Sequence, residues 1–325
     1  MTAETPKILI TGAAGQIGSE LTPLLRKKYG AENVVASDIK TDISPKLLES
    51  GPYETLDVTD KQRIQEVIQT QHIDCIFHMS AILSAVGENR PQLAWDVNMN
   101  GTHNILEAAR LMKIEKLFVP SSIAVFGPGT PCDNTPQESV LRPQTMYGVT
   151  KVSAELLCDY YVQRYGLDVR GCRYPGIISY ETLPGGGTTD YAVAIFYEAV
   201  EHGRFTCFLS ENTMLPMMYM PDCLKATIKL MEADFSRLRH HSDFNIAGMS
   251  FTPRELAAEI KKHLPDFQIE YNPDYRQQIA ESWPRSIDDS AARADWDWRP
   301  DYDLALMTED MLKVLQERQT QTNLD

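Results

Sequence analysis

Two side chains that could carry acid–base chemistry stand four residues apart in the segment MYGVTK. Tyr147 and Lys151 open a predicted helix over residues 147–165 and so share one of its faces. A lysine ammonium beside a phenol favours the phenolate and lowers the pKa of the tyrosine, which would make it a base near neutral pH. Upstream, Ser121 and Ser122 end a predicted strand, and their hydroxyls could orient a substrate oxygen toward the phenol. The set predicts oxidation of an alcohol, whereas the Tyr–Lys pair alone also fits a solvated helical face.

A glycine-rich turn near the N-terminus could hold a dinucleotide. Gly12, Gly15 and Gly18 have the spacing G-x-x-G-x-x-G, directly after a predicted strand and before a predicted helix. Glycine at these points permits a tight turn and close approach of the backbone to a pyrophosphate, and the helix N-terminus adds N–H groups and a positive dipole end. Gln16 and Ile17 open that helix and are predicted to contact the cofactor with the glycine residues. A glycine turn without a ligand is the alternative.

An acidic residue follows at the position where dinucleotide sites bind a ribose. Asp38 ends the next predicted strand, ~20 residues after the turn, where a carboxylate accepts hydrogen bonds from ribose hydroxyls. The same carboxylate would repel a 2′-phosphate and favours NAD over NADP, although Lys40 nearby leaves NADP open. Asp57 and Val58 are predicted to flank the adenine. For Asp38 alone, capping or solvation is the alternative.

The elements that must position these residues alternate between strand and helix. Continuous apolar runs predict strands buried on both faces, at residues 7–12, 33–38, 75–81, 116–122 and 168–174. Helical patterns between and after them cover residues 16–29, 61–71, 91–112, 147–165 and 253–263, the last with Thr252 as its cap. The alternation predicts an α/β fold, a Rossmann-type doubly wound parallel sheet with a smaller C-terminal α/β lobe. We expect an NAD-binding domain over residues 1–176 and a substrate-binding lobe over 177–325, interleaved with the first.

Composition restricts the partners and the compartment. The 325 residues carry a net charge of −14 and show no basic run, which argues against binding to nucleic acid or to an anionic membrane. No long apolar segment or signal peptide is visible, and the six cysteines are widely spaced, so neither a disulfide framework nor a metal site is indicated. We expect a cytoplasmic protein, with the mitochondrial matrix as the other compartment.

Long motifs connect the chain with a known family. The segments GAAGQIG, PSSIAVFGP, MYGVTK, RYPGIIS, LPGGGTTDYAV, LPMMYMPD and SWPRSIDDS resemble the extended short-chain dehydrogenases/reductases, and within them the short-chain type of L-threonine 3-dehydrogenase, relatives of the UDP-galactose 4-epimerases. The resemblance implies Ser122, Tyr147 and Lys151 as the catalytic set, with Ser121 assisting or exchanging roles with Ser122. It implies that Asn100 supports the active-site helix. It further implies cofactor contacts from Ser80, Ala81 and Tyr174.

The C-terminal lobe decides between dehydrogenase and epimerase. The epimerases hold the UDP diphosphate with an asparagine and an arginine, and this chain has Gly176 and Leu215 at those positions. A small zwitterion needs only a few convergent polar groups. The resemblance and the residue types predict substrate contacts from Gly187, Thr188 and Thr189, with Ser84 reaching the pocket and Trp283 closing it. A flexible glycine loop and a core tryptophan are the alternatives.

The resemblance implies one reaction and a partner of the same kind. The C3 hydroxyl of L-threonine would be oxidised to 2-amino-3-oxobutanoate with NAD as the cofactor and no metal. A homodimer would form through the helices at 91–112 and 147–165. A UDP-sugar 4-epimerase and a non-catalytic NAD-binding regulator are the remaining alternatives, and His78 is expected to be a packed, structural residue.

Overall fold

The chain divides into two compact units, which the computed structural model describes over residues 5–183, 185 and 187–322. Unit 1 comprises Met1–Val125, Gln144–Arg173 and Ala226–Phe244. Unit 2 comprises Phe126–Pro143, Tyr174–Lys225 and Asn245–Asp325.

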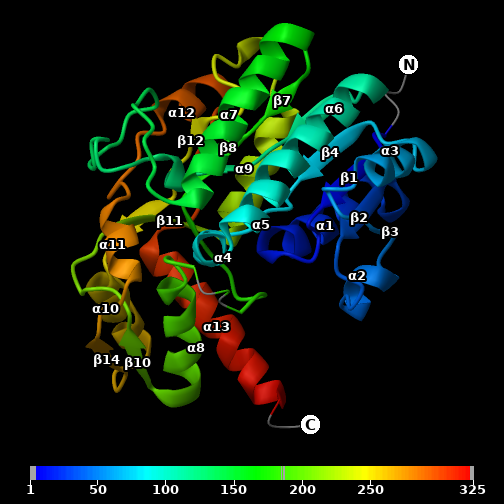
Figure 1. Ribbon diagram of the computed structural model, residues 1–325. Helices are drawn as coiled ribbons and strands as arrows, with labels where there is room; N and C mark the ends of the chain where they lie inside the picture. Colours follow the sequence, from blue (N-terminus) through cyan, green and yellow to red (C-terminus); the bar gives the residue numbers. More distant parts are fainter. Residues whose placement is uncertain (1–4, 184, 186, 323–325) are drawn as a thin grey trace. The chain divides into compact units, whose positions relative to one another are not determined.

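Unit 1 is built on a six-stranded parallel sheet in the order β3-β2-β1-β4-β5-β7 (Figure 1). Its strands are β1 (Ile8–Thr11), β2 (Val34–Asp38), β3 (Tyr53–Thr55), β4 (Cys75–His78), β5 (Lys116–Phe118) and β7 (Val169–Arg170). The chain runs outward from β1 to β3 and then returns to place β4 on the other side of β1, with Ile8 paired with both Val34 and Cys75. The strand order therefore reverses at the β1/β4 boundary, where doubly wound sheets bind their ligands.

Helices cover both faces of this sheet. They are α1 (Gln16–Tyr29), α2 (Pro45–Glu49), α3 (Lys61–Thr70), α4 (Ser84–Asn89), α5 (Pro91–Trp95), α6 (Thr102–Met112), α7 (Met146–Tyr165) and the last turns of α9 (Met220–Glu232). Apolar side chains of α3, α6 and α7 join Leu9, Ile76 and Leu117 of the strands in one buried cluster. Neighbouring strand residues point to the opposite face. The strands β1, β2, β4 and β7 are buried along their whole length, whereas the edge strand β3 is partly exposed. Burial on both sides explains the continuous apolar runs of the inner strands, and the sheet confirms the predicted doubly wound fold.

Unit 2 contains smaller sheets and five helices. The order β13-β11-β9 joins β13 (Met249–Phe251), β11 (Leu215–Tyr219) and β9 (Gly176–Ile178), and β10 (Arg204–Cys207) pairs with β14 (Gln268–Tyr271). The helices are α8 (Tyr191–His202), α10 (Pro253–His263), α11 (Arg276–Glu281), α12 (Ser290–Trp296) and α13 (Leu304–Thr322). A further short sheet, β12-β8-β6, consists of β6 (Ser121–Ser122), β8 (Cys172–Tyr174) and β12 (Phe244–Asn245), and most of its residues belong to unit 1.

Three predicted elements are divided in the structure. The strand expected over 116–122 forms β5 in the large sheet and β6 in the short one. The helix expected over 91–112 consists of α5, a π-helical segment Asp96–Gly101 and α6. The strand expected over 168–174 is interrupted at Gly171, so β7 stays in the large sheet whereas β8 joins the short one. None of the described helices combines the length and the apolar character that a membrane crossing requires.

Candidate active site

The glycine-rich turn between β1 and α1 forms the first part of the site. Gly12 has a φ of +69°, a conformation that favours glycine, and a Cβ there would lie 2.7 Å from the backbone nitrogen of Ser80. A Cβ on Gly18 would lie 2.2 Å from the carbonyl oxygen of Gly12. Gly15 is the N-cap of α1, and the first turn, which begins with Gln16 and Ile17, has neither a capping side chain nor an acidic residue. The positive end of this helix therefore fits an anionic pyrophosphate.

Asp38 touches the same turn from the end of β2. It is 8% exposed, and its carboxylate accepts hydrogen bonds from the N–H groups of Ala14 at 3.0 Å and Lys40 at 3.1 Å. The acid is thereby held at the edge of the turn, where its remaining acceptor capacity fits ribose hydroxyls. Asp57 is half-buried and accepts hydrogen bonds from its neighbour Thr59, and Val58 is buried. The contacts of these residues with a nucleotide stay predictions.

Ser122, Tyr147 and Lys151 are brought together in unit 1. The first turn of α7 is fixed by Thr145, whose hydroxyl accepts a hydrogen bond from the N–H group of Gly148. Tyr147 and Lys151 then share one face of α7, and the Lys151 Nζ lies 5.6 Å from the centroid of the Tyr147 ring. The side chain of Ser122, at the end of β6, interacts with the phenol and lowers its pKa, and its hydroxyl accepts a hydrogen bond from the Ala124 N–H group at 3.2 Å. The geometry can hold an alcohol oxygen between a hydroxyl and a phenol and move its proton.

Burial dominates the protonation of this set. Burial raises the pKa of Tyr147 to about 12, and the hydrogen bond with Ser122 opposes that rise. Burial lowers the pKa of Lys151 to about 8, opposed by Cys158 and Glu155. The expectation that the lysine lowers the phenol pKa is therefore not met, because desolvation of the phenolate outweighs the other effects. The spacing of the two residues carries no information about this burial.

The active-site helix is supported by Asn98, and the assignment of this role to Asn100 is wrong. The Asn98 amide accepts from the Ile82 N–H group at 2.8 Å and donates to the Ile82 carbonyl at 3.0 Å and to the Thr150 hydroxyl at 3.1 Å. Thr150 in turn donates to the carbonyl of Tyr147 at 2.8 Å. Asn100 is exposed and donates to an aspartate within the π-helical segment. Both asparagines stand in the motif NMNGT, and the sequence contains no signal that separates them.

A chain of buried hydrogen bonds joins the glycine turn to Asn98. The Thr102 hydroxyl donates to the Asn98 carbonyl at 2.6 Å, so it accepts from Nε2 of His78 at 3.2 Å. Nδ1 of His78 then accepts from the Thr11 hydroxyl at 2.9 Å, and Thr11 accepts from the N–H group of Ser80. Burial lowers the pKa of His78 to about 3, so the ring stays neutral. His78 is the packed residue that the sequence predicted, with both ring nitrogens bonded.

The remaining predicted site residues of unit 1 are Ser80, Ala81, Ser84 and Ser121. Ser80 and Ala81 are half-buried and directly follow β4, beside the glycine turn. Ser84 is buried in the first turn of α4. Ser121 is buried, and its hydroxyl donates to the carboxylate of Glu155. Its side chain is therefore engaged by α7, a contact that sequence reasoning missed.

In unit 2, Gly187 of the predicted substrate loop is hydrogen-bonded to Asp190, the N-cap residue of α8. The Gly187 N–H group donates to the Asp190 carboxylate at 2.7 Å, so an acid of the chain already uses the group that was expected to meet a substrate carboxylate. Thr188 is buried and Thr189 is half-buried, directly before α8. Gly186 of this loop lies outside the described residues.

Two other predicted residues of unit 2 are aromatic and buried. Tyr174 ends β8 and is 5% exposed. Trp283 follows α11 and is 7% exposed. Gly176 lies nearby in the sequence, and a Cβ there would lie 2.5 Å from Sδ of Met217 and 2.7 Å from Cγ2 of Thr189. Those two side chains thus fill the space that a larger residue at position 176 would need.

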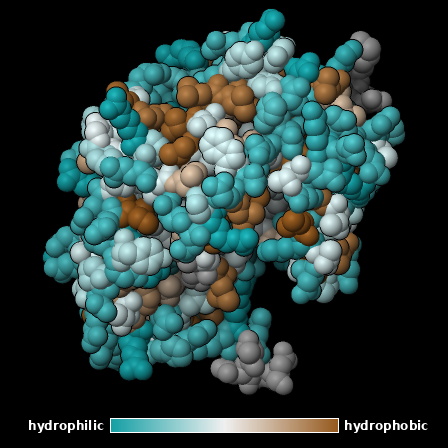
Figure 2. Space-filling view, in the orientation of Figure 1, coloured by the Kyte–Doolittle hydropathy of each residue, from teal (hydrophilic) through white to brown (hydrophobic). Residues whose placement is uncertain are grey.

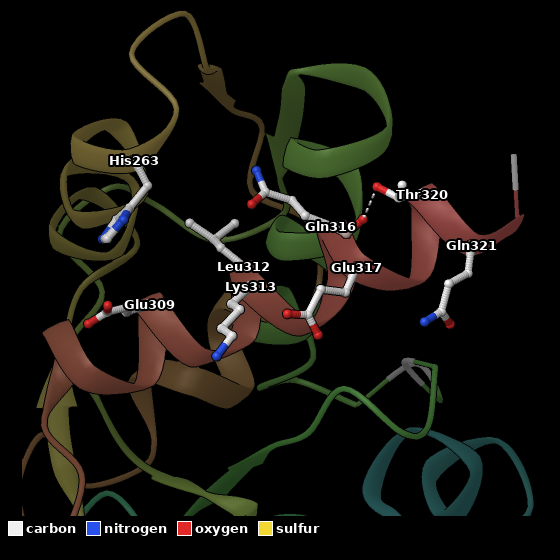
Figure 3. A pocket seen from close by; sticks show the side chains of 8 residues that line it. All are labelled: His263, Glu309, Leu312, Lys313, Gln316, Glu317, Thr320 and Gln321. Atoms are coloured by element: carbon white, nitrogen blue, oxygen red, sulfur yellow. Dashed lines mark hydrogen bonds between the residues drawn. The ribbon is translucent and has the colours of Figure 1, made fainter. Parts of the chain in front are cut away.

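A groove of about 720 Å³ lies elsewhere in unit 2, along α13 (Figure 3). It is lined by His263, Glu309, Leu312, Lys313, Gln316, Glu317, Thr320 and Gln321. Figure 3 shows His263 on α10 and the other side chains on α13, and they do not converge on one point. None of the predicted site residues lines it, and we do not include it in the candidate site.

Comparison with known proteins places this geometry in a family. The model of the NAD dependent epimerase/dehydratase family matches residues 8–247. The chain belongs to this family. An uncharacterized epimerase/dehydratase of Staphylococcus haemolyticus is 48% identical over 314 residues, covering 96% of this chain and 98% of that protein. Solved L-threonine dehydrogenases are also similar. That of Clostridium difficile is 52% identical with a TM-score of 0.95, and the match covers 97% of this chain and 99% of that one. That of Phytophthora infestans is 52% identical with a TM-score of 0.93, and the match covers 96% of this chain and 99% of that one.

Membership of the NAD dependent epimerase/dehydratase family gives the two halves of the site their meaning. The glycine turn, the α1 N-terminus and Asp38 are the part of unit 1 that fits a nicotinamide dinucleotide, and Ser122, Tyr147 and Lys151 are the part that fits a proton transfer. The family and the solved relatives confirm the predicted assignment to the extended short-chain dehydrogenases/reductases.

Proposed function

We propose that this chain is an NAD-dependent L-threonine 3-dehydrogenase, which oxidises the C3 hydroxyl of L-threonine to 2-amino-3-oxobutanoate. The observation that carries the proposal is the 52% identity with solved L-threonine dehydrogenases over nearly the whole chain. The intact set of Ser122, Tyr147 and Lys151 supports it, because these side chains supply the hydroxyl, the phenol and the ammonium that removal of a proton from an alcohol would use.

Three side chains of unit 1 take part in the proposed reaction. The phenolate of Tyr147 takes the proton of the C3 hydroxyl, and the hydroxyl of Ser122 holds the same oxygen by a hydrogen bond. Lys151 supplies positive charge beside the phenol and a donor for a ribose hydroxyl. When bound, an oxidised nicotinamide supplies the acceptor for the hydride that leaves C3. Loss of one proton and one hydride converts the alcohol into the ketone.

The residues that meet the cofactor and the amino-acid groups stay predictions. NAD is favoured over NADP by the buried carboxylate of Asp38 at the turn. Substrate contacts from Ser84, Gly187, Thr188, Thr189 and Trp283 rest on the sequence resemblance. Because the N–H group of Gly187 is bonded to Asp190, binding of a carboxylate there would require that bond to be exchanged.

A UDP-sugar epimerase is the alternative that the family name leaves to be tested. The packing around Gly176 disfavours it, since Met217 and Thr189 fill the space that the side chain of the epimerases' asparagine would need. The purified chain is incubated with NAD and either L-threonine or a UDP-hexose. We expect NADH absorbance to increase with L-threonine and not in the Tyr147→Phe variant. Turnover of the UDP-hexose alone would refute the proposal.

We also propose that the chain forms a homodimer through α7. Val149, Leu156 and Tyr160 occupy one side of this helix at spacings of seven and four, and they are 39%, 65% and 52% exposed. Figure 2 shows hydrophobic surface over this helix within a largely hydrophilic face. An exposed apolar stripe of this kind is suited to a two-fold contact with its own copy. Light scattering after gel filtration tests it, and the mass of a single chain would refute it.

The compartment is proposed on the chemistry of the thiols. No disulfide joins any of the six cysteines, all of which are among the described residues, and five of them are buried. Reduced thiols are typical of a reducing compartment such as the cytoplasm.

A further inference from the structure

The catalytic helix contacts the end of β6 at three successive turns. The phenol of Tyr147 interacts with the side chain of Ser122, and one turn later the Nζ of Lys151 donates to the carbonyl of Pro120 at 2.7 Å. One further turn along, the carboxylate of Glu155 accepts a hydrogen bond from the hydroxyl of Ser121. The spacing of four keeps the three side chains on one face of α7. α7 therefore contacts Ser122 and also the two residues directly before it, Pro120 and Ser121.

Glu155 is itself held rigidly from the far side. Arg173 of β8 donates from Nε to one carboxylate oxygen at 2.9 Å and from a terminal nitrogen to the other at 2.8 Å. Both side chains are buried, at 5% and 4% exposure. A two-point guanidinium–carboxylate contact fixes the plane of the carboxylate. The hydroxyl of Ser121 thus meets an acceptor that cannot rotate away.

Other charged groups surround this pair, and they bear on any pH response. Asp243 lies 3.7 Å from the Arg173 guanidinium and 3.4 Å from Nδ1 of His240. Asp159, one turn beyond Glu155 on α7, accepts from the Ser242 hydroxyl at 3.4 Å, and burial raises its pKa to about 6. On the catalytic side, Glu155 faces Lys151, whose pKa it raises against the effect of burial.

We propose that Glu155 is a positioning residue for the reaction: by holding Ser121 it fixes the end of β6, and thereby keeps the hydroxyl of Ser122 beside Tyr147. Ser121 is then a positioning residue too and makes no substrate contact, which departs from its assignment on sequence grounds. The negative charge of Glu155 also favours the ammonium form of Lys151. This inference rests on the proposed function, and the experiment separates the two.

The test compares Ser121→Ala, Glu155→Gln and the double variant with the wild type. Because both residues act through Ser122, each single variant should lower kcat ~10-fold, while the KM for L-threonine stays within ~2-fold of the wild type. The kcat of the double variant should be no more than ~2-fold below that of the less active single variant. The Glu155→Gln variant should also shift the acidic limb of the kcat/KM profile to lower pH, because Lys151 loses its proton more readily without the carboxylate.

Asp168→Asn is the matched control for loss of a buried ion pair in unit 1. Asp168 pairs with Arg170 at 2.7 Å, and the Arg170 side chain is 1% exposed. Its kcat should stay within ~2-fold of the wild type, since the pair touches no residue of the catalytic set. Ser121→Ala leaves the Glu155–Arg173 contact intact, so it carries the test if Glu155→Gln does not fold.

Two results would overturn the inference. One is an unchanged kcat in Ser121→Ala. The other is a rise in KM alone, which would mean that Ser121 contacts the substrate directly. If the wild type forms no NADH from L-threonine, the proposed function fails by itself. The crystal structures of the wild type and of Ser121→Ala then decide the positioning role: the Ser122 hydroxyl should lie farther from the phenol of Tyr147 in the variant, and an unchanged position of Ser122 would contradict us.

Discussion

Replacing Asn98 by alanine removes three hydrogen bonds behind the catalytic helix at once. The side chain is 4% exposed and bonds both backbone groups of Ile82 as well as the hydroxyl of Thr150. A buried polar group left without a partner costs ~1–3 kcal/mol, so the loss of both Ile82 partners should lower the free energy of unfolding by ~2–5 kcal/mol. Because Thr150 also bonds the carbonyl of Tyr147, the start of α7 should loosen and kcat should fall.

Urea unfolding followed by circular dichroism measures this loss, and Asn100→Ala is its matched control. Asn100 is exposed and bonds Asp96 at 3.1 Å, so its removal should change the free energy of unfolding by no more than ~0.5 kcal/mol. Activity is read in the same preparations. If Asn98→Ala is as stable and as active as the wild type, or if the Asn100 variant is the damaged one, the support of α7 has been assigned to the wrong residue.

Three further outcomes follow from the site. Asp38→Ala should relax the cofactor preference toward NADP, measured as the ratio of kcat/KM for the two cofactors, and an unaltered ratio would count against the ribose contact. Gly18→Ala brings a Cβ to 2.2 Å from the carbonyl oxygen of Gly12 and should weaken NADH binding, measured by fluorescence titration. Gly129→Ala is the control, because a Cβ at Gly129 meets no atom within 4 Å and should leave NADH binding unchanged. Equal NADH affinities of the two variants would refute the close packing of the glycine turn. For His78, the unfolded state takes up a proton near its ordinary pKa of 6.5 and the folded state only near 3, so this histidine destabilises the fold increasingly as the pH falls from 6.5 toward 3. Urea unfolding at pH 7 and pH 5 should show a smaller loss in His78→Gln than in the wild type, and equal losses would refute the buried neutral ring.

The sheet could be predicted from the sequence because its signal is local. Strands buried on both faces appear as continuous apolar runs, and β1, β2, β4 and β5 lie within the predicted segments. The end signals of helices are also local. The helix Pro253–His263 begins where Thr252 and Glu255 form a capping box, and the predicted cap is confirmed.

The remaining errors arise where geometry depends on tertiary contacts. Within the helix predicted at 91–112, the segment Asp96–Gly101 is π-helical, and a widened turn rotates each later side chain relative to the usual helical period. Periodicity alone therefore could not decide between Asn98 and Asn100. Glu155 was missed for a similar reason: a glutamate on a helix is normally a surface residue, and only the fold brings Arg173 and Ser121 to it.

The same limit applies to the strength of the catalytic base. Residue type and spacing identify Tyr147 and Lys151, but burial sets their pKa values at about 12 and about 8. Of the two groups, the lysine therefore loses its proton more readily, and the phenolate–ammonium form has the smaller share. Any added positive charge near the phenol, or negative charge near the lysine, enlarges that share. Glu155 provides the second of these effects from within the chain, so fixing Ser122 and favouring the Lys151 ammonium are two consequences of a single buried carboxylate.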